Sequence, residues 1–421
     1  MSRTLIVYIF GVGAILLVFL LTMLGDPDPV NPHFKATKSL LNTLFYSCSI
    51  VATIAVAYFG YQSVWSNKKG DLRAVLIFGI AGMAIVVLYI LSFNPILAPN
   101  GDNAEYIINA KSLVERGGIY RLDTRTETPN TLAAPGLPLM LVPVYVKWGL
   151  DFIKMKYLIM FMGILILPLL FVLFRMSMNF PASCFLSLIG FSSPYLVANS
   201  TTIMTETPYL FWSLLTLIFA IKYAQTKSIS LINYLGLLIF LTLAISTRLI
   251  GVSLLLSLFV YLGLRLPYFK TLNRKGKAGY DRSPTLRFFV LFIPVLLVLF
   301  SWQWIQSQGP TSPLNIFLNM GVGQHLHDNF ISLFNVLADL LFNPMAFRWY
   351  RLSPEHNLPL FNIAWLPVYL IIAIGIYSDL RRKRLMGLYT VSMILLILVA
   401  SFTPQERVTM RYVSVIIPIL I

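Results

Sequence analysis

The chain has 421 residues, of which 57% are hydrophobic and 11% are charged. Soluble globular domains carry about 25% charged residues, so the composition excludes an ordinary soluble enzyme and favours a polytopic helical membrane protein. The formal net charge is +16, but Lys and Arg lie mostly in short loops between apolar runs, which indicates membrane topology and not a nucleic-acid-binding surface. The two cysteines, Cys48 and Cys184, lie within apolar segments and predict neither a disulfide framework nor a thiolate metal site.

Apolar segments long enough to cross a bilayer recur along the whole chain. Eleven of them lie at residues 4–24, 39–64, 73–93, 155–175, 181–203, 208–224, 231–247, 249–265, 287–305, 361–380 and 386–402. The first follows Arg3 without a small-residue cleavage site, which predicts an uncleaved span and not a signal peptide. An apolar run after Tyr412 is too short to cross and is expected to be truncated. The sequence therefore predicts an all-α polytopic membrane protein with about 11 to 12 transmembrane helices.

Three clusters of Lys and Arg assign the sides of the membrane. They lie at residues 68–73, 265–287 and 381–384, and the positive-inside rule predicts that all three face the cytoplasm. If the apolar segment 134–150 is not counted, six crossings separate the first cluster from the second, so both clusters lie on the same side. Counting this segment as a seventh crossing would place the most basic loop, 265–287, outside the cytoplasm. Prolines within this segment also make a regular spanning helix costly. We therefore expect it to be re-entrant or to lie on the membrane surface.

This assignment predicts that residues 94–153, the turn around Glu206 and residues 306–360 share the extracytoplasmic side. Residues 231–265 are then two tight crossings hinged near Arg248, because one helix of that length would extend well beyond about 30 Å of hydrocarbon. We divide the chain into three N-terminal transmembrane helices (1–93), an extracytoplasmic acidic loop with juxtamembrane helices (94–153), a transmembrane core (154–305), a second extracytoplasmic loop (306–360) and C-terminal transmembrane helices (361–421). A long ordered loop beside a membrane usually carries function.

Within the acidic loop, apolar residues recur at helical spacing and predict an amphipathic helix along the membrane surface, ending at Gly117. Asp102 stands at the N-cap and Glu105 follows three residues later, which is the spacing of a capping box. Capping alone accounts for both carboxylates. Capping and catalysis are compatible roles, because a carboxylate fixed at a helix start beside the membrane is also a well-oriented base or metal ligand.

Two further charged residues lie next to predicted crossings. Glu206, in TIMTETPYLF, is the only acidic residue between Asp151 and Asp281. It either complements the dipole of a helix N-terminus or serves a function, since an ionisable side chain among crossings is costly. Arg248, in AISTRLIG, is predicted either to snorkel to the interface or to bind a lipid phosphate through its planar guanidinium.

The later extracytoplasmic residues offer a metal motif and an anion site. His325, His327 and Asp328 have the residue types of a metal site, but solvated loop residues are the simpler interpretation. Arg407 and Arg411 lie on this side against the bias of basic residues toward the cytoplasm. Such arginines predict an anion to bind.

Several of these segments resemble a known family. The run GDNAEYIINAKSLVERGGIY followed by APGLPLMLVPVYVKWG resembles the first extracytoplasmic loop of GT-C class membrane glycosyltransferases, in particular the RgtA/B/C/D-like and protein-mannosyltransferase-like enzymes. The resemblance continues through TIMTETPYLFWSLL and STRLIG, covers residues 94–265, and extends weakly to the final RYVSVIIP. Each motif alone has low specificity, and their order and spacing carry the resemblance.

The resemblance implies a glycosyltransferase of the cytoplasmic (inner) membrane. Its donor would be a polyprenyl-phosphate-linked sugar and its acceptor a lipid, glycan or protein on the extracytoplasmic side, with inversion at the anomeric carbon. Asp102 would act as the catalytic base or orient the acceptor, and Glu206 would be the second acidic catalytic group. Membrane lipid is a further implied partner, whereas nucleic acid is not.

The resemblance also implies a set of substrate-binding residues. Arg248 and Arg411 would lie near the lipid phosphate, and Glu105 and Tyr106 would bind substrate beside the catalytic carboxylate of the loop. Inverting displacement needs one carboxylate to take the acceptor proton and cations to hold the leaving phosphate. The resemblance implies no definite cofactor and leaves a divalent cation at the acidic loop open.

Three features depart from the family pattern. Many relatives have one crossing before the acidic loop, and this chain is predicted to have three. Adjacent acidic pairs of some relatives are replaced by Asp102, Asn103, Ala104 and Glu105, which puts metal dependence in doubt. The expected truncation would remove helices that relatives possess.

Two other classes of function stay open. A transporter or flippase of lipid-linked saccharides needs no loop carboxylate as a base, but transporters tend to show paired repeats and broken helices, and the sequence displays neither. A noncatalytic assembly subunit is the third hypothesis, and it predicts that both carboxylates are dispensable.

Overall fold

The computed structural model describes residues 70–96, 102–120, 134–225, 231–265 and 366–400, together with five positions between 293 and 300. The secondary-structure elements in these ranges are all helical, and the described part of the chain has no β-strand element. This confirms the predicted all-α class for that part. The predicted crossings at 4–24 and 39–64 and the second extracytoplasmic loop lie outside the described residues.

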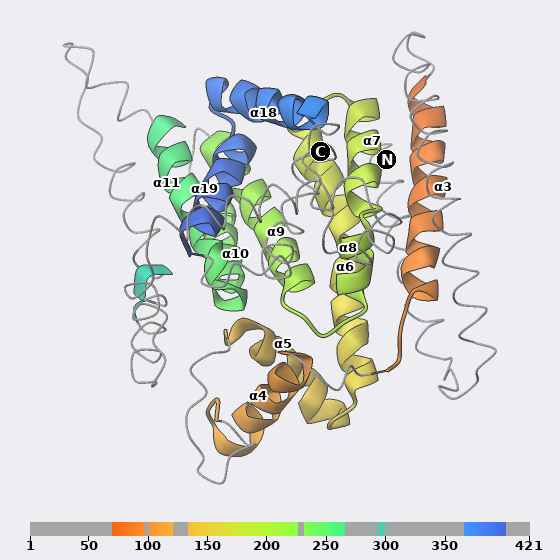
Figure 1. Ribbon diagram of the computed structural model, residues 1–421, viewed down its shortest axis with the longest axis vertical. Helices are drawn as coiled ribbons and strands as arrows, with labels where there is room; N and C mark the ends of the chain where they lie inside the picture. Colours follow the sequence, from red (N-terminus) through yellow and green to blue (C-terminus); the bar gives the residue numbers. More distant parts are fainter. Residues whose placement is uncertain are drawn as a thin grey trace, which may run out of the picture.

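The helices form a bundle with a short helical layer at each end (Figure 1). In chain order they are α3 (Gly70–Leu91), α4 (Asp102–Arg116), α5 (Gly136–Trp148), α6 (Phe152–Arg175), α7 (Phe180–Phe191), α8 (Pro194–Ser200), α9 (Glu206–Gln225), α10 (Leu231–Thr247), the 3-10 turn η1 (Leu249–Gly251), α11 (Val252–Arg265), α18 (Leu366–Arg381) and α19 (Leu385–Ala400). Within the described ranges, α6 and α9 are long and apolar enough to cross a membrane. The polytopic arrangement in a membrane stays a prediction.

An aspartate and an asparagine act as N-caps of α6 and α7. The carboxylate of Asp151 accepts a hydrogen bond from the backbone N–H of Lys154 at 3.0 Å, and α6 starts at the next residue. Asn179 accepts from the N–H of Ala182 at 3.1 Å in the same way at the start of α7. Such caps satisfy backbone donors that a helix leaves without partners. They therefore fix where α6 and α7 begin.

The predicted crossing at residues 181–203 is a broken rod in the structure. It consists of α7 and α8, separated at Ser192 and Ser193. Pro194 has no backbone N–H and its ring crowds the preceding turn, so it opens a new helix instead of continuing the old one. An apolar count alone does not register this break.

Small residues let the rods approach closely. A Cβ atom at Gly163 of α6 would lie within 2.6 Å of the side chain of Ser200 at the end of α8. Tyr89 of α3 stacks on Phe191 of α7 at 4.6 Å between ring centroids and donates its hydroxyl to the Phe191 carbonyl at 2.9 Å. Close approach of backbones through glycine and serine is typical of helix pairs that pack without large side chains between them.

The two ends of the bundle differ in what they carry. At the lower end in Figure 1, α4 and α5 lie together beneath the start of α9 and beside the start of α6. We call this the α4–α5 end. At the opposite end, the C-termini of α6, α9 and α11 meet the turn between α18 and α19. We call it the basic end, because the run Arg381–Arg384 and the terminal arginines of α6 and α11 belong to it.

Six helical segments between residues 70 and 265, which we call rods, connect these ends. They are α3, α6, the α7–α8 pair, α9, α10 and α11 with η1. The helix α5 is not one of them: it has 13 residues, so it is about 20 Å long at 1.5 Å per residue, and it lies beside α4 (Figure 1). The described chain thus runs between the ends the same number of times as the charge pattern of the sequence requires.

The segment predicted to cross at residues 361–380 has a different arrangement. The helix α18 lies across the basic end of the bundle and does not run alongside the other rods (Figure 1). The reason is in its sequence, because Ser378, Asp379 and Arg381 interrupt the apolar run. In the described part of the chain α18 has 16 residues, and these polar residues lie in its last turn.

Candidate functional site

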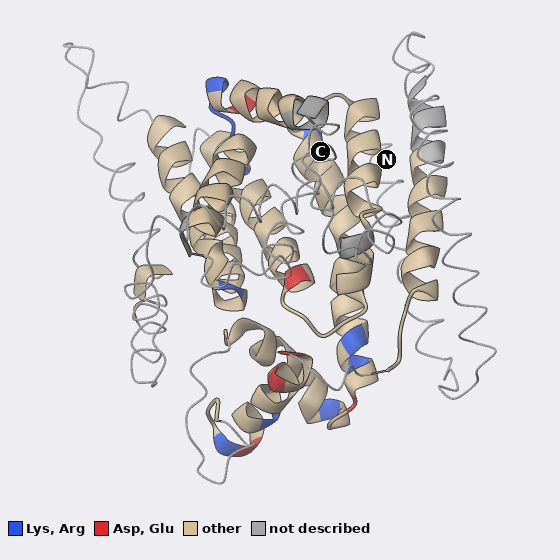
Figure 2. Cartoon of the chain, viewed as in Figure 1, with Lys and Arg blue, Asp and Glu red and all other residues tan. Residues whose placement is uncertain are grey.

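The start of α9 places a carboxylate inside the protein. Glu206 is the first residue of α9, and its side chain is 3% exposed. The turn is closed by the N–H of Tyr209, which donates to the carbonyl of Thr205 at 2.9 Å. The positive end of a helix dipole favours an anionic side chain at this position. Charged residues are sparse along the rods and gather toward the two ends (Figure 2).

Arg248 occupies the break between α10 and η1. Its backbone is extended, with φ −149° and ψ 134°, although its N–H still donates to the carbonyl of Ala244 at 3.1 Å. Its carbonyl accepts from the N–H of Gly251 at 2.9 Å, which starts η1. The hinge expected near this arginine is therefore present, and the guanidinium projects from a bend and not from the side of a continuous helix.

These two side chains form a buried ion pair. The Nη1 atom of Arg248 lies 2.9 Å from Oε1 of Glu206, and the side chains are 9% and 3% exposed. Each charge pays a large desolvation cost on burial, and removing one partner of such a pair typically costs about 3–5 kcal/mol. Because α9 and α10 are antiparallel neighbours, the start of the first helix and the end of the second necessarily meet at the α4–α5 end.

Tyr106 of α4 connects the acidic loop to this pair. Its hydroxyl interacts electrostatically with Arg248, Asp102 and Glu206 and hydrogen-bonds the side chain of Thr205. Burial is the main cause that raises the pKa of Tyr106 above its ordinary value. The guanidinium of Arg248 opposes that increase, and the two carboxylates add to it. The hydroxyl therefore stays protonated at neutral pH and is available as a hydrogen-bond donor.

The structure places Asp102 and Glu105 in the first turn of α4, one turn or less before Tyr106. Both carboxylates are partly exposed, in contrast to Glu206. The site thus has one buried, paired carboxylate and an accessible pair of carboxylates next to it. Tyr106 is close enough to Asp102, Glu206 and Arg248 to interact with them electrostatically, and Arg248 contacts Glu206 directly.

The helix α5 packs against the end of α10, next to Arg248. A Cβ atom at Gly136 would lie 2.6 Å from the backbone of Ser246 and Thr247, so α5 begins in direct contact with the end of α10, immediately before Arg248. The apolar side chains of Leu137 and Leu141 are fully buried in the same small core as Tyr106. Position and orientation of α4 therefore depend on α5.

Lys156, which is buried in the structure, is not singled out by the sequence analysis. Lys156 of α6 is 3% exposed, and its ammonium group donates to the carbonyls of Asn94 and Ile96, both at 2.7 Å. It fastens the chain that leaves α3 to the start of α6 and so directs it toward α4. A lysine within a predicted crossing is an available signal, because such residues are costly unless they have a role.

Several predicted residues lie outside the described ranges. They are Arg407, Arg411, His325, His327 and Asp328. The expected contribution of Arg411 to an anion site is therefore neither supported nor opposed by the structure. Among the described residues, no group of three or more His, Cys, Asp and Glu side chains has the spacing of a metal site.

Comparison of the chain with protein-family models, with curated proteins and with solved structures found no match.

Proposed function

We propose that the chain is an integral-membrane glycosyltransferase of the GT-C type. In this proposal it transfers a sugar from a polyprenyl-phosphate donor to a lipid, glycan or protein acceptor on the extracytoplasmic side of the cytoplasmic membrane. The observation that supports it most is the meeting of the buried Glu206–Arg248 pair with Tyr106 and the first turn of α4 at one end of an apolar bundle. Catalysis of this type needs a carboxylate and a cation on opposite sides of one reacting carbon.

The proposed reaction divides the roles among these residues. Asp102 takes the proton of the acceptor hydroxyl as its oxygen forms a bond to the anomeric carbon. The bond between that carbon and the phosphate oxygen breaks at the same time, and the electron pair leaves with the polyprenyl phosphate. Arg248 stabilises the charge on the leaving phosphate, because a planar guanidinium binds two phosphate oxygens at once.

Glu206 has a second role in this scheme. By holding one edge of the Arg248 guanidinium, it orients the remaining N–H groups, which is how an outer charged partner improves a binding group. Tyr106, kept protonated by its surroundings, donates a hydrogen bond to a substrate oxygen. The donor sugar would then lie between α4 and the Arg248 bend.

The proposal is tested by a transfer assay with a radiolabelled polyprenyl-phosphate sugar and the full chain in detergent. A general base contributes about 10² to 10⁴ in rate, so Asp102→Asn is expected to lower turnover by at least about a hundredfold. Glu206→Gln is expected to lower turnover by more than about tenfold, because it weakens the partner that orients Arg248. Glu115→Gln is the matched control, because Glu115 lies at the exposed end of the same helix and should retain activity.

Turnover within about tenfold of the parent for both carboxylate variants, in protein that is folded, would remove these residues from catalysis. Detergent also eliminates any transmembrane gradient. Transfer in detergent therefore separates an enzyme from a transporter or flippase of lipid-linked saccharides, which would form no product.

A further inference from the structure

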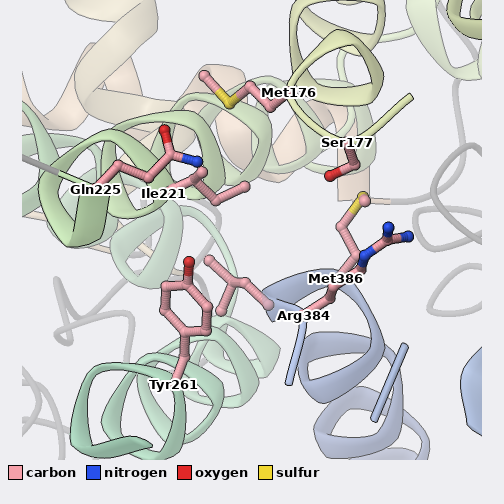
Figure 3. Close-up of a pocket in the computed structure, with 8 residues that line it drawn as sticks. Met176, Ser177, Ile221, Gln225, Tyr261, Arg384 and Met386 are labelled. Atoms are coloured by element: carbon pink, nitrogen blue, oxygen red, sulfur yellow. The ribbon is translucent and has the colours of Figure 1, made fainter. Parts of the chain in front are cut away.

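A cavity opens at the basic end, far from the proposed transfer site. It has a volume of about 230 Å³ and lies where the ends of α6, α9 and α11 meet the start of α19 (Figure 3). Its lining residues are Met176, Ser177, Ile221, Gln225, Tyr261, Arg384, Leu385 and Met386. The opposite end of the bundle holds α4, α5 and the Glu206–Arg248 pair, so this cavity belongs to a different site.

The lining combines apolar and polar groups in a way that suits an amphipathic ligand. Methionine, leucine and isoleucine side chains form the apolar wall, whereas Ser177, Gln225 and Tyr261 bring a hydroxyl, an amide and a phenol to its surface. Figure 3 shows these three polar groups directed toward the space between the helices. Arg384 supplies the only charge among the lining residues of this pocket.

The turn between α18 and α19 fixes Arg384 at the rim. The N–H of Arg384 donates to the carbonyl of Asp379 at 2.8 Å and that of Lys383 to the carbonyl of Leu380 at 2.9 Å, which together form a Schellman motif. Lys383 occupies its left-handed position with φ +55°, where glycine is the usual residue and a lysine costs about 1 kcal/mol. Strain of this kind tends to persist at functional sites.

The side chain of Arg384 is also held in place. Its Nη1 atom lies 3.1 Å from Oδ1 of Asp379, with the two side chains 26% and 21% exposed. One edge of the guanidinium is thus anchored by a carboxylate within the same turn. A planar guanidinium that is anchored on one edge has further N–H donors that can bind an anion.

The surroundings of the cavity are basic and apolar at once. Arg381, Arg382 and Lys383 are exposed beside it. On the adjacent helix α18, the exposed residues Leu370 and Ile374 lie four positions apart, on one side of the helix. Basic residues next to an apolar helix face are the pattern of a segment that lies at the surface of an anionic membrane.

We propose that this cavity binds the phosphodiester headgroup of an anionic phospholipid, with the phosphate on Arg384 and the headgroup hydroxyls toward Ser177 and Tyr261. Its volume, below the roughly 300–1,000 Å³ of sites for larger ligands, fits a headgroup and leaves the acyl chains outside along the apolar bundle. Basic pockets between helices at a membrane surface bind headgroups of this class. The lipid would hold α18 across the ends of the other helices.

The test compares lipids and variants on the full chain purified in a neutral detergent. Mixed micelles containing phosphatidylglycerol should raise the unfolding temperature, whereas phosphatidylcholine, inorganic phosphate and glycerol 3-phosphate should not. Native mass spectrometry should show phosphatidylglycerol retained by the parent. Arg384→Gln is expected to weaken this retention about tenfold, as the loss of one charge-assisted hydrogen bond does.

Two further variants distinguish a pocket from general charge attraction. Arg382→Gln removes an equal charge from the same basic run without touching the cavity, and it should leave retention within about twofold of the parent. Ser177→Trp fills the cavity at unchanged charge and should abolish the preference for phosphatidylglycerol. Equal losses for Arg384→Gln and Arg382→Gln, retention undiminished in Ser177→Trp, or full stabilisation by glycerol 3-phosphate alone would each overturn the proposal.

Discussion

At the scale of single residues, the central feature is the ion pair between Arg248 and Glu206. Both residues are recognisable in the sequence as charges beside predicted crossings, and each has an ordinary interpretation as an interfacial or dipole-complementing residue. Their pairing at 2.9 Å is not visible in the sequence, because it depends on how the α9–α10 hairpin brings its open ends together. The same holds for Tyr106 of α4, which interacts with Thr205 and Glu206 at the start of α9 and with Arg248 after α10.

A double-mutant cycle tests whether this pair acts as a unit. Glu206→Leu and Arg248→Met are each expected to lower the free energy of unfolding by about 3–5 kcal/mol, because each leaves one buried charge without its counterpart. The double variant should cost less than the sum of the two by about 2 kcal/mol or more. Reversible unfolding in mixed detergent micelles measures all four proteins.

The control cycle uses a surface pair on α4. Lys111 and Glu115 lie 3.9 Å apart with 35% and 44% of their side chains exposed, and exposed pairs of this kind couple by about 0.3–0.5 kcal/mol. Strict additivity at Glu206 and Arg248, indistinguishable from this exposed pair, would mean that the buried contact does not hold the two residues together.

At the scale of elements, α5 decides where the acidic loop lies. Its proline content and the parity of the basic clusters predict a segment that does not cross, and the structure has a 13-residue helix beside α4. The break between α7 and α8 and the lateral position of α18 do not follow from the spacing of apolar runs, since both depend on local interruptions within them. Pro194 causes the first and the polar residues near Asp379 the second.

Gly136 offers a direct probe of how α5 packs against α10. Gly136→Val would place methyl groups against the backbone of Ser246 and Thr247, which cannot move aside as a flexible side chain could. We expect the unfolding temperature to fall and protease cleavage between α4 and α5 to accelerate by about tenfold or more, as for overpacking that costs about 1–3 kcal/mol.

Gly79→Val is the matched control for this substitution. A Cβ atom at Gly79 of α3 would meet nothing within 4 Å, so the variant changes helix propensity without a steric clash. Equal effects of the two substitutions on cleavage between α4 and α5 would show that this helix is not held by its contact with α10.

At the scale of the whole molecule, the two ends of the bundle carry different charged groups. The described rods run between an end that carries α4, α5 and the ion pair and an end that carries the basic turn of α18 and α19 (Figure 2). The number of rods follows from the spacing of apolar runs and basic loops, which is a one-dimensional property. The convergence of Asp102, Tyr106, Glu206 and Arg248 is three-dimensional, and motif order could suggest it only through resemblance.

The measurement that tests the account most directly is cysteine accessibility in intact cells. In a background with Cys48 and Cys184 replaced by serine, single cysteines are placed at three exposed positions: Arg116 at the end of α4, Lys147 at the end of α5, and Arg382 in the basic turn. An impermeant maleimide should label Arg116→Cys and Lys147→Cys from outside the cell, and Arg382→Cys only after the membrane is opened. Labelling of Arg116→Cys and Lys147→Cys from opposite sides, or of Arg382→Cys from outside, would contradict the account.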